Sequence, residues 1–386
     1  MGKRARTKGR SAGGERRRRK GQGFEASSAA LPAIEALHDL PTFSDFCIGA
    51  AQLEAFEKAR TATEAPDEMQ IGCVVRLDRG FPLVVTADDR FRAEHAVGFA
   101  KQNKEKDDGL LPAVGDRVMV RRAPGHDMGV IEMVLPRRTA FERWRGKNRG
   151  ERQVLCANVD TVLIVQALGA GEVLLGRVAR SLVLARDCGA APVVVLTKAD
   201  RCEPAEVEHE LERVQRLVGP EVPVLVTSSA EGRGLEQVRS AVPAGACAMI
   251  LGESGAGKST LLNALLGHEA LATGAVRERD DAGRHTTVAR VMVALPGDAG
   301  VIADAPGLRS LPLVGHERGL ALTFPEVVQA ARACRFSDCT HTHEPGCGVR
   351  AAVEAGDIDQ VRLDAFLALA AEMRVSAQSL DPDIHI

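Results

Sequence analysis

One glycine-rich loop constrains the fold of this chain more than any other feature. The loop fits the pattern G-x-x-x-x-G-K-[ST] in full and lies between an apolar run at 248–251 and a helix-forming run at 260–266. A strand that leads through such a loop into a helix predicts a parallel sheet covered by helices on both faces. The loop consists of Gly252, Glu253, Ser254, Gly255, Ala256, Gly257, Lys258 and Ser259, and Thr260 follows it.

The residue types of this loop suit a chain of phosphates. Glycines let the backbone turn tightly enough for its N–H groups to point at phosphate oxygens, and the N-terminus of the next helix adds positive partial charge. Lys258 can reach the β and γ phosphates, and the Ser259 hydroxyl can coordinate Mg²⁺. A turn that binds nothing has no use for a Lys-Ser pair at a helix start, so we expect a nucleotide with Mg²⁺ here.

Two polar segments downstream are candidates for sensing the γ phosphate. The Asp-Ala-Pro-Gly stretch at 304–307 follows an apolar strand, so Asp304 can hold Mg²⁺ through water while the Gly307 N–H meets the γ phosphate. The stretch Gly-Arg-His-Thr-Thr before it contains Thr286 and Thr287, either of which can supply a second Mg²⁺-binding hydroxyl.

The nucleobase is addressed by a motif that ends another apolar strand. Its residues are Thr197, Lys198, Ala199 and Asp200, which match the [NT]-K-x-D pattern of guanine recognition. One carboxylate can accept from both the N1–H and the exocyclic amine of guanine, and adenine lacks this pair of donors. Ser229 and Ala230 follow the next strand, where we expect a backbone N–H to meet the guanine oxygen.

The order of these motifs is unusual. In ordinary GTP-binding domains the phosphate loop comes first, whereas here Asp200 precedes Gly252. A circularly permuted chain can assemble the same sheet, because strand pairing does not depend on where the chain starts. The segment at Asp304 then leads directly into the C-terminal region, so a shift on hydrolysis can be transmitted there.

The C-terminal region contains a cluster of soft metal ligands. Cys334, Cys339, His341 and Cys347 have the spacing C-x4-C-x-H-x5-C. Three thiolates and one imidazole form a closed structural Zn²⁺ set with no position for a catalytic water. His343 is the second-ranked nitrogen donor.

The remaining sequence indicates a reduced, multidomain protein. The other six cysteines are scattered singly, which is typical of a cytoplasmic chain, and no run approaches the roughly 18 apolar residues of a membrane span. Residues 1–20 carry ten Lys or Arg against one Glu, although the whole chain has a net charge of −2. This basic stretch is typical of a solvated, mobile arm, and about half of such arms touch nucleic acid or another polyanion.

Pattern changes along the chain predict four regions. A basic, mobile extension spans 1–66, with helical potential at 50–60, and a barrel spans 67–142, with five short strands that fit an OB-like or an SH3-like barrel. A polar linker at 143–153 opens the third region, the permuted P-loop domain at 143–310. A helical zinc-binding domain occupies 311–386.

Taken together, these motifs resemble the RsgA (YjeQ) family of GTPases that act in small ribosomal subunit biogenesis. The resemblance covers residues 71–366 and includes the barrel motifs Asp-Arg-Gly-Phe-Pro at 78–82 and Gly-His-Asp-Met-Gly at 125–129. It implies an OB-fold barrel, GTP hydrolysis to GDP stimulated by the 30S subunit and its rRNA, one Zn²⁺, and a role in late subunit maturation. The chain departs from the commoner motif residues at Thr197, where Asn is usual, and at Ala305, where Thr or Ser is usual.

Catalysis also needs an oriented water. Many GTPases place Gln directly after the Gly of the Asp-x-x-Gly motif, but this chain has Leu308 there, which predicts slow intrinsic turnover. The family resemblance makes His285 the candidate that completes the site when the ribosomal surface orders residues 277–287. The expected protein is a cytoplasmic monomer. The alternatives are an RNA-binding module with an inactive GTPase fold and an ATP-using P-loop enzyme, and Asp200 argues against the latter.

Overall fold

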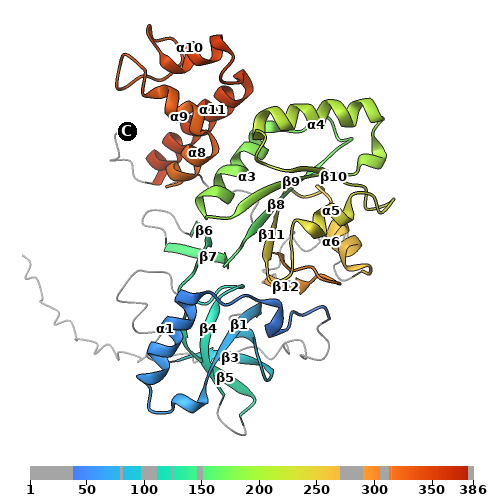
Figure 1. The fold of residues 1–386 in the computed structure, drawn as a ribbon, viewed down its shortest axis with the longest axis vertical. Coiled ribbons are helices and arrows are strands. Elements are labelled where there is room, and N and C mark those ends of the chain that lie inside the picture. The colour runs from blue at the N-terminus through green and yellow to red at the C-terminus, as the bar shows by residue number, and fades with distance from the viewer. Residues whose placement is uncertain are drawn as a thin grey trace, which may run out of the picture.

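The computed structural model describes residues 38–78, 81–96, 111–122, 126–145, 151–269, 290–304, 313 and 315–380. These residues form three parts (Figure 1): a barrel at the bottom of the view, a sheet covered by helices in the middle, and a helical C-terminal region at the top left. The strands of the barrel and of the central sheet belong to one continuous 11-stranded sheet in the order β10-β9-β8-β11-β13-β12-β1-β2-β3-β5-β4.

The barrel is closed and has the topology of an OB fold. Its strands are β1 (Met69–Asp78), β2 (Phe81–Thr86), β3 (Arg90–His95), β4 (Arg117–Arg121) and β5 (Met128–Val134). Pairing of β1 with β4 closes the order β1-β2-β3-β5-β4, and β3 pairs with β5 in parallel. The strand order confirms the OB-like prediction over the SH3-like alternative. Apolar side chains such as Val74, Phe91 and Ile131 fill the interior.

The segment before the barrel is folded from His38 onward. The prediction of a mobile extension over 1–66 is therefore wrong for residues 38–66. It contains two 3₁₀ turns, η2 (Phe43–Asp45) and η3 (Pro66–Glu68), and helix α1 (Ala50–Thr61). Phe56 packs with Met119 and Leu135 of the barrel, and the buried Gln52 amide donates to Asn158 Oδ1 at 3.2 Å. The Ala/Glu-rich sequence of α1 is typical of a solvated helix, but the helix is held against the barrel by the face that carries Gln52 and Phe56. Residues 1–37 lie outside the described part.

The described parts of the expected polar linker at 143–153 lie in two paired strands instead. Strands β6 (Ala140–Arg145) and β7 (Glu151–Ala157) pair antiparallel between the barrel and the central sheet. Leu155 and Cys156 at the end of β7 are buried, although the charged residues before them suggested a loop. Charged residues can alternate with apolar ones along a strand, which explains why the composition alone misled the prediction.

The central sheet is mostly parallel, as predicted. Its strands are β8 (Thr161–Ala167), β9 (Ala191–Thr197), β10 (Val224–Val226), β11 (Cys247–Leu251), β12 (Arg290–Ala294) and β13 (Val301–Asp304). All neighbours pair in parallel except β12, which runs antiparallel to both β13 and the barrel strand β1. One row of opposite residues therefore runs from Arg76 in β1 through Val291 in β12 to Asp304 in β13.

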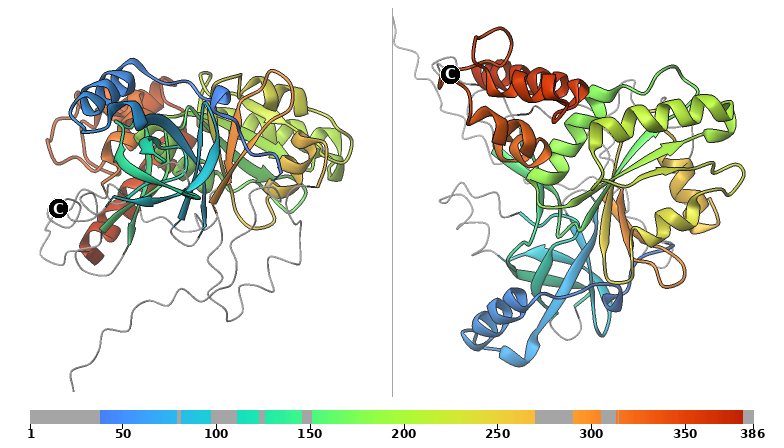
Figure 2. Two further views of the ribbon diagram at one scale, coloured as in Figure 1. Left: turned by 90° about the horizontal axis from the view of Figure 1, so that it is seen from below. Right: turned by 45° about the horizontal axis from the view of Figure 1, so that its top comes forward.

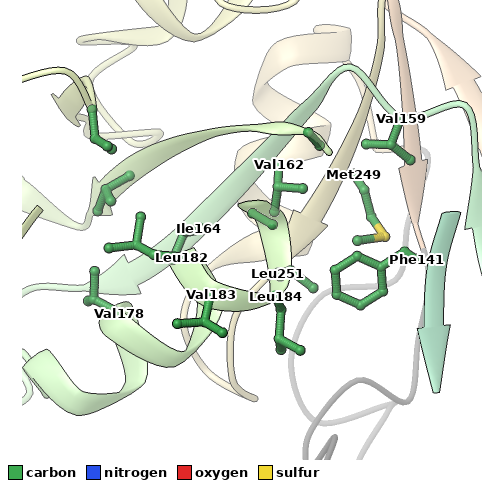
Figure 3. Close-up of a cluster of buried hydrophobic side chains, with 14 of the residues drawn as sticks. Phe141, Val159, Val162, Ile164, Val178, Leu182, Val183, Leu184, Met249 and Leu251 are labelled. Carbon is green, nitrogen blue, oxygen red and sulfur yellow. The ribbon is translucent and has the colours of Figure 1, made fainter. Parts of the chain in front are cut away.

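Helices cover both faces of this sheet (Figure 2). Helices α3 (Leu175–Asp187) and α4 (Pro204–Val218) pack on one face, and α5 (Leu235–Ser240) and α6 (Lys258–Leu266) pack on the other. Alternate residues of β8 serve the two cores: Ile164 contacts the α3 side and Leu163 the α6 side. Figure 3 shows Val178 and Leu182 of α3 pointing toward Ile164.

The C-terminal region is helical, as expected, and docks on α3 and α4. It contains α8 (Glu317–Thr323), α9 (Pro325–Ala331), α10 (Gly348–Ala355) and α11 (Gln360–Leu380). Asp187 at the end of α3 accepts from the Gly319 N–H at 2.9 Å and lies 2.7 Å from His316 Nδ1. A Cβ on Gly319 would lie 2.3 Å from the Val183 carbonyl oxygen, so glycine permits the close approach of α8 to α3. Among the described helices, none is both long and apolar enough to span a bilayer.

Candidate nucleotide and metal sites

The nucleotide motifs meet at one edge of the central sheet. Asp200 follows β9, the glycine-rich loop follows β11, and Asp304 ends β13. These strands run parallel with β8 between β9 and β11, so their carboxyl ends lie at the same edge. The crevice outside the carboxyl ends of parallel strands is where open α/β sheets bind ligands.

The loop after β11 has the backbone geometry of a phosphate cradle. Three glycines adopt positive φ values, 153° at Gly252, 81° at Gly255 and 89° at Gly257. A Cβ on Gly252 would lie 2.5 Å from the Val165 carbonyl oxygen, so a larger residue cannot start the loop here. Gly257 is the N-cap of α6, which places the positive end of that helix at the loop.

The lysine of the loop is held over its own backbone. Lys258 Nζ donates to the carbonyl oxygens of Gly252 at 2.7 Å and Glu253 at 2.6 Å. Ser259 follows in the first turn of α6 and Thr260 is exposed next to it. An ammonium group beside a glycine-lined backbone turn is the arrangement that binds β and γ phosphates.

The guanine motif is tied directly to the phosphate loop. Thr197 Oγ1 donates to the Ala256 carbonyl at 2.7 Å, and Lys198 Nζ donates to the Gly255 carbonyl at 2.5 Å. Lys198 adopts left-handed backbone angles, with φ of 61°, and Ala199 behind it is buried in the core. Thr197 therefore makes this link between the two motifs, although Asn was expected to be the usual residue there.

Asp200 is exposed at the site and is oriented by a residue that the sequence analysis did not identify. Ser228 Oγ donates to Asp200 Oδ1 at 2.7 Å, and this hydrogen bond holds the pKa of Asp200 below its ordinary value. Ser228 is fully buried and its hydroxyl also accepts from the Glu231 N–H at 3.2 Å. Ser229 and Ala230 follow in the same turn, and they are half-buried and exposed respectively.

Two adjacent serines after a strand do not reveal from sequence which hydroxyl faces the carboxylate. The one available signal is that Ser228 stands nearer the strand, where inward-facing positions are buried.

The described part of the γ-phosphate region is Asp304. It is half-buried at the end of β13, opposite Val291 in β12. The predicted residues His285, Thr286, Thr287 and Gly307 lie outside the described residues.

The predicted zinc ligands converge. The Sγ atoms of Cys334, Cys339 and Cys347 and a ring nitrogen of His341 all lie within 4.8 Å of one another. The Cys334 and Cys347 sulfurs are 3.9 Å apart, and each is 3.5 Å from His341 Nδ1. Tetrahedral Zn²⁺ with Zn–S bonds of about 2.3 Å requires sulfurs about 3.8 Å apart, so the donor set fits this ion.

The loop that carries these ligands is folded by one carboxylate. Glu344 accepts backbone N–H groups of Thr340 at 3.0 Å and of Thr342 and His343 at 3.2 Å each. The hydrogen bond from the Thr340 hydroxyl is the main reason that the pKa of Glu344 lies well below its usual range. His343, the alternative nitrogen donor, is exposed and its Nδ1 lies 2.8 Å from the Thr342 hydroxyl, not in the cluster.

Comparison with known proteins places the chain in a family. A family model described as RsgA GTPase matches residues 134–314. The small ribosomal subunit biogenesis GTPase RsgA of Streptomyces coelicolor is 43% identical over 312 residues, which are 81% of this chain and 82% of the relative. The corresponding protein of Opitutus terrae is 41% identical over 350 residues, 88% of this chain and 90% of the relative.

Solved structures agree with the fold. YjeQ from Thermotoga maritima superposes with a TM-score of 0.60 at 25% identity, covering 79% of this chain and 99% of that one. YloQ, described as a circularly permuted GTPase, superposes with a TM-score of 0.57 at 22% identity over 80% of this chain and 96% of its own, which shows a shared fold. Together with the site geometry, these matches show that the chain belongs to the RsgA family of circularly permuted GTPases.

Proposed function

We propose that this chain hydrolyses GTP to GDP and phosphate and acts in the biogenesis of the small ribosomal subunit. The observation that carries the proposal is the contact of Thr197 and Lys198 with the carbonyls of Ala256 and Gly255. Because of these bonds, a base at Asp200 and phosphates at Lys258 belong to one nucleotide. The role in subunit biogenesis is inferred from the relatives, which are named small ribosomal subunit biogenesis GTPases.

Asp200 selects the base. Its carboxylate accepts from the N1–H and the exocyclic amine of guanine, while Ser228 fixes its orientation. The turn containing Ser229 and Ala230 supplies a backbone N–H to the guanine oxygen. Adenine offers no such pair of donors to the carboxylate, which is the physical basis of discrimination.

Lys258 and the loop backbone bind the phosphates, and the Ser259 hydroxyl together with Asp304 would hold Mg²⁺. Both are oxygen donors at the edge of the sheet where the phosphates lie, which suits this ion. When bound, Mg²⁺ neutralises charge that develops on the phosphate oxygens. Thr286 or Thr287 would supply a second hydroxyl, and Gly307 would supply an N–H to the γ phosphate.

The attacking water is positioned by His285 once the ribosomal partner orders residues 277–287. Leu308 stands where many GTPases have Gln, so the isolated chain lacks that amide. We expect His285→Ala to keep GTP affinity and to lose the turnover that small subunits stimulate. Stimulated turnover that survives the substitution would exclude this role.

Cys334, Cys339, His341 and Cys347 would hold one structural Zn²⁺. Burial lowers the pKa of His341, which favours the neutral imidazole that metals bind. The purified chain should contain one zinc per molecule, and Cys347→Ser should lose it and unfold the loop between α9 and α10. A zinc content near zero in the wild-type chain, prepared without chelator, would contradict the site.

The partner is the 30S subunit and its rRNA, and the chain acts as a cytoplasmic monomer. The decisive measurement is steady-state hydrolysis of GTP and of ATP, each with and without purified small subunits. Stimulation confined to GTP supports the proposal, and equal turnover of both nucleotides excludes guanine selection. Tight GTP binding with no turnover in either condition would instead indicate an RNA-binding module with an inactive nucleotide site.

A further inference from the structure

The first turn of α3 contacts the phosphate loop through one ion pair. The Arg177 guanidinium binds the carboxylate of Glu253, the second residue of the loop. Both side chains are about half exposed, 49% for Arg177 and 47% for Glu253, so the contact lies at the rim of the nucleotide site.

The main-chain carbonyl of Glu253 accepts two hydrogen bonds from within the loop. Its carbonyl oxygen accepts from Lys258 Nζ at 2.6 Å and from the Ala256 N–H at 3.2 Å. A restraint on the Glu253 side chain therefore limits the movement of the loop backbone at this position.

Arg177 is presented by a rigid element. Its N–H donates to the Leu174 carbonyl at 2.9 Å at the start of α3, and Val178 next to it is fully buried against the sheet. Arg180, one turn later on α3, pairs with Glu372 of α11. The two arginines thus offer a matched comparison on one helix.

We infer that Arg177 is a positioning residue for the phosphate loop, acting through Glu253. This inference rests on the proposed function and adds to it a residue outside the nucleotide motifs. The pair fixes the loop backbone, which binds the β phosphate equally in GTP, in the transition state and in GDP. Uniform binding of this kind changes nucleotide affinity and KM but not kcat.

The test measures Kd for GTP and GDP, with kcat and KM, in the full-length chain. Arg177→Gln and Glu253→Gln should each raise both Kd values and KM about two- to fivefold, the range of partly exposed ion pairs, with kcat unchanged. The double variant should be no worse than either single variant. The reversed pair, Arg177→Glu with Glu253→Arg, should recover affinity, and the effects should shrink at high ionic strength.

Arg180→Gln is the control, with the same charge change on the same helix, and should leave nucleotide affinity as in the wild type. Unchanged Kd values in Arg177→Gln, additive losses in the double variant, or an equal loss in Arg180→Gln each overturn the inference. A wild-type chain that binds neither nucleotide overturns the proposed function, and this inference with it.

Discussion

At the scale of single residues, the site depends on short hydrogen bonds from side chains to loop carbonyls and to the Asp200 carboxylate. Thr197 and Lys198 hold the phosphate loop, and Ser228 holds Asp200. The sequence motifs predicted which carboxylate and which lysine converge, because those residue types have few other uses in that context. They did not predict Ser228, because the twist of the chain after β10, not the residue type, decides which serine faces the carboxylate.

Replacing Ser228 should weaken guanine binding. We expect Ser228→Ala to lower GTP affinity about three- to tenfold, because Asp200 loses the charge-assisted hydrogen bond that orients it. Ser229→Ala is the matched control and should have little effect, since only its backbone is used. Titration calorimetry with GTP distinguishes the two, and equal losses in both variants would refute the assignment.

The same hydrogen bond predicts a difference in pH dependence. Ser228 lowers the pKa of Asp200. In the proposed function guanine binds to the ionised carboxylate, so we expect affinity to be lost as the pH falls through that lowered pKa. In Ser228→Ala the pKa returns toward its ordinary value, so the loss should begin at higher pH. Binding curves that fall at the same acidic pH in both proteins would contradict this.

Asp200→Asn tests base selection itself. The amide donates where guanine also donates, so GTP affinity should fall about tenfold or more, while xanthosine triphosphate, which has an acceptor at that position, should bind better. Competition between the two nucleotides measures the change. Unaltered GTP affinity would remove Asp200 from the site.

At the scale of helices and strands, buried periodic segments were predicted well and charged segments were not. Helix α4 (Pro204–Val218) is an example of a segment with clear sequence signals, because a Pro start, an amphipathic pattern and a glycine end act together. The pairing of β6 with β7 was missed, because the charged residues of these strands are also typical of a linker. Helix α1 was recognised only as potential, since its docking depends on the surface of a distant barrel.

The contact between α8 and α3 should be sensitive to one methyl group. Gly319→Ala places a Cβ 2.3 Å from the Val183 carbonyl oxygen, so we expect a loss of about 1–3 kcal/mol in the free energy of unfolding. Gly176→Ala on α3, where no atom beyond the adjacent residues and the backbone of the helix lies within 4 Å of the added Cβ, should be neutral or slightly stabilising. Thermal unfolding compares the pair, and equal melting temperatures would show that α8 moves away freely.

At the scale of the whole molecule, the C-terminal region is attached to α3 and α4, the two helices on one face of the central sheet. Arg186 of α3 donates to the Leu322 carbonyl at 2.6 Å, and Arg216 of α4 pairs with Asp359 at 2.8 Å. Arg362 of α11 makes a third, more buried link, because its guanidinium donates to the carbonyl of Leu217 at the end of α4. The C-terminal region therefore contacts α4, which follows Asp200, and α3, which carries the Arg177 that pairs with Glu253, besides following Asp304 in the chain.

Arg362 should hold the C-terminal region in place. Its guanidinium binds the carbonyls of Leu217 and Thr323 and the Glu326 carboxylate, and it stacks 5.1 Å from the Phe324 ring centre. Arg362→Met leaves these acceptors unpaired and should cost about 2–4 kcal/mol of stability.

Limited proteolysis should then cut between the central sheet and α8 sooner than in the wild type. Arg350→Met, which removes an exposed pair 3.9 Å from Glu354, is the control. Cleavage at the same rate in both variants would contradict the role of Arg362.

The antiparallel pairing of β12 with β1 gives the barrel a second role. Were residues 69–134 removed, β12 would become an edge strand with unpaired N–H and C=O groups, and such edges recruit other chains. The barrel is therefore a protective cover for the enzyme as well as a domain in its own right. A variant without the barrel would need another strand to pair with β12, because the central sheet would otherwise tend to aggregate through that edge.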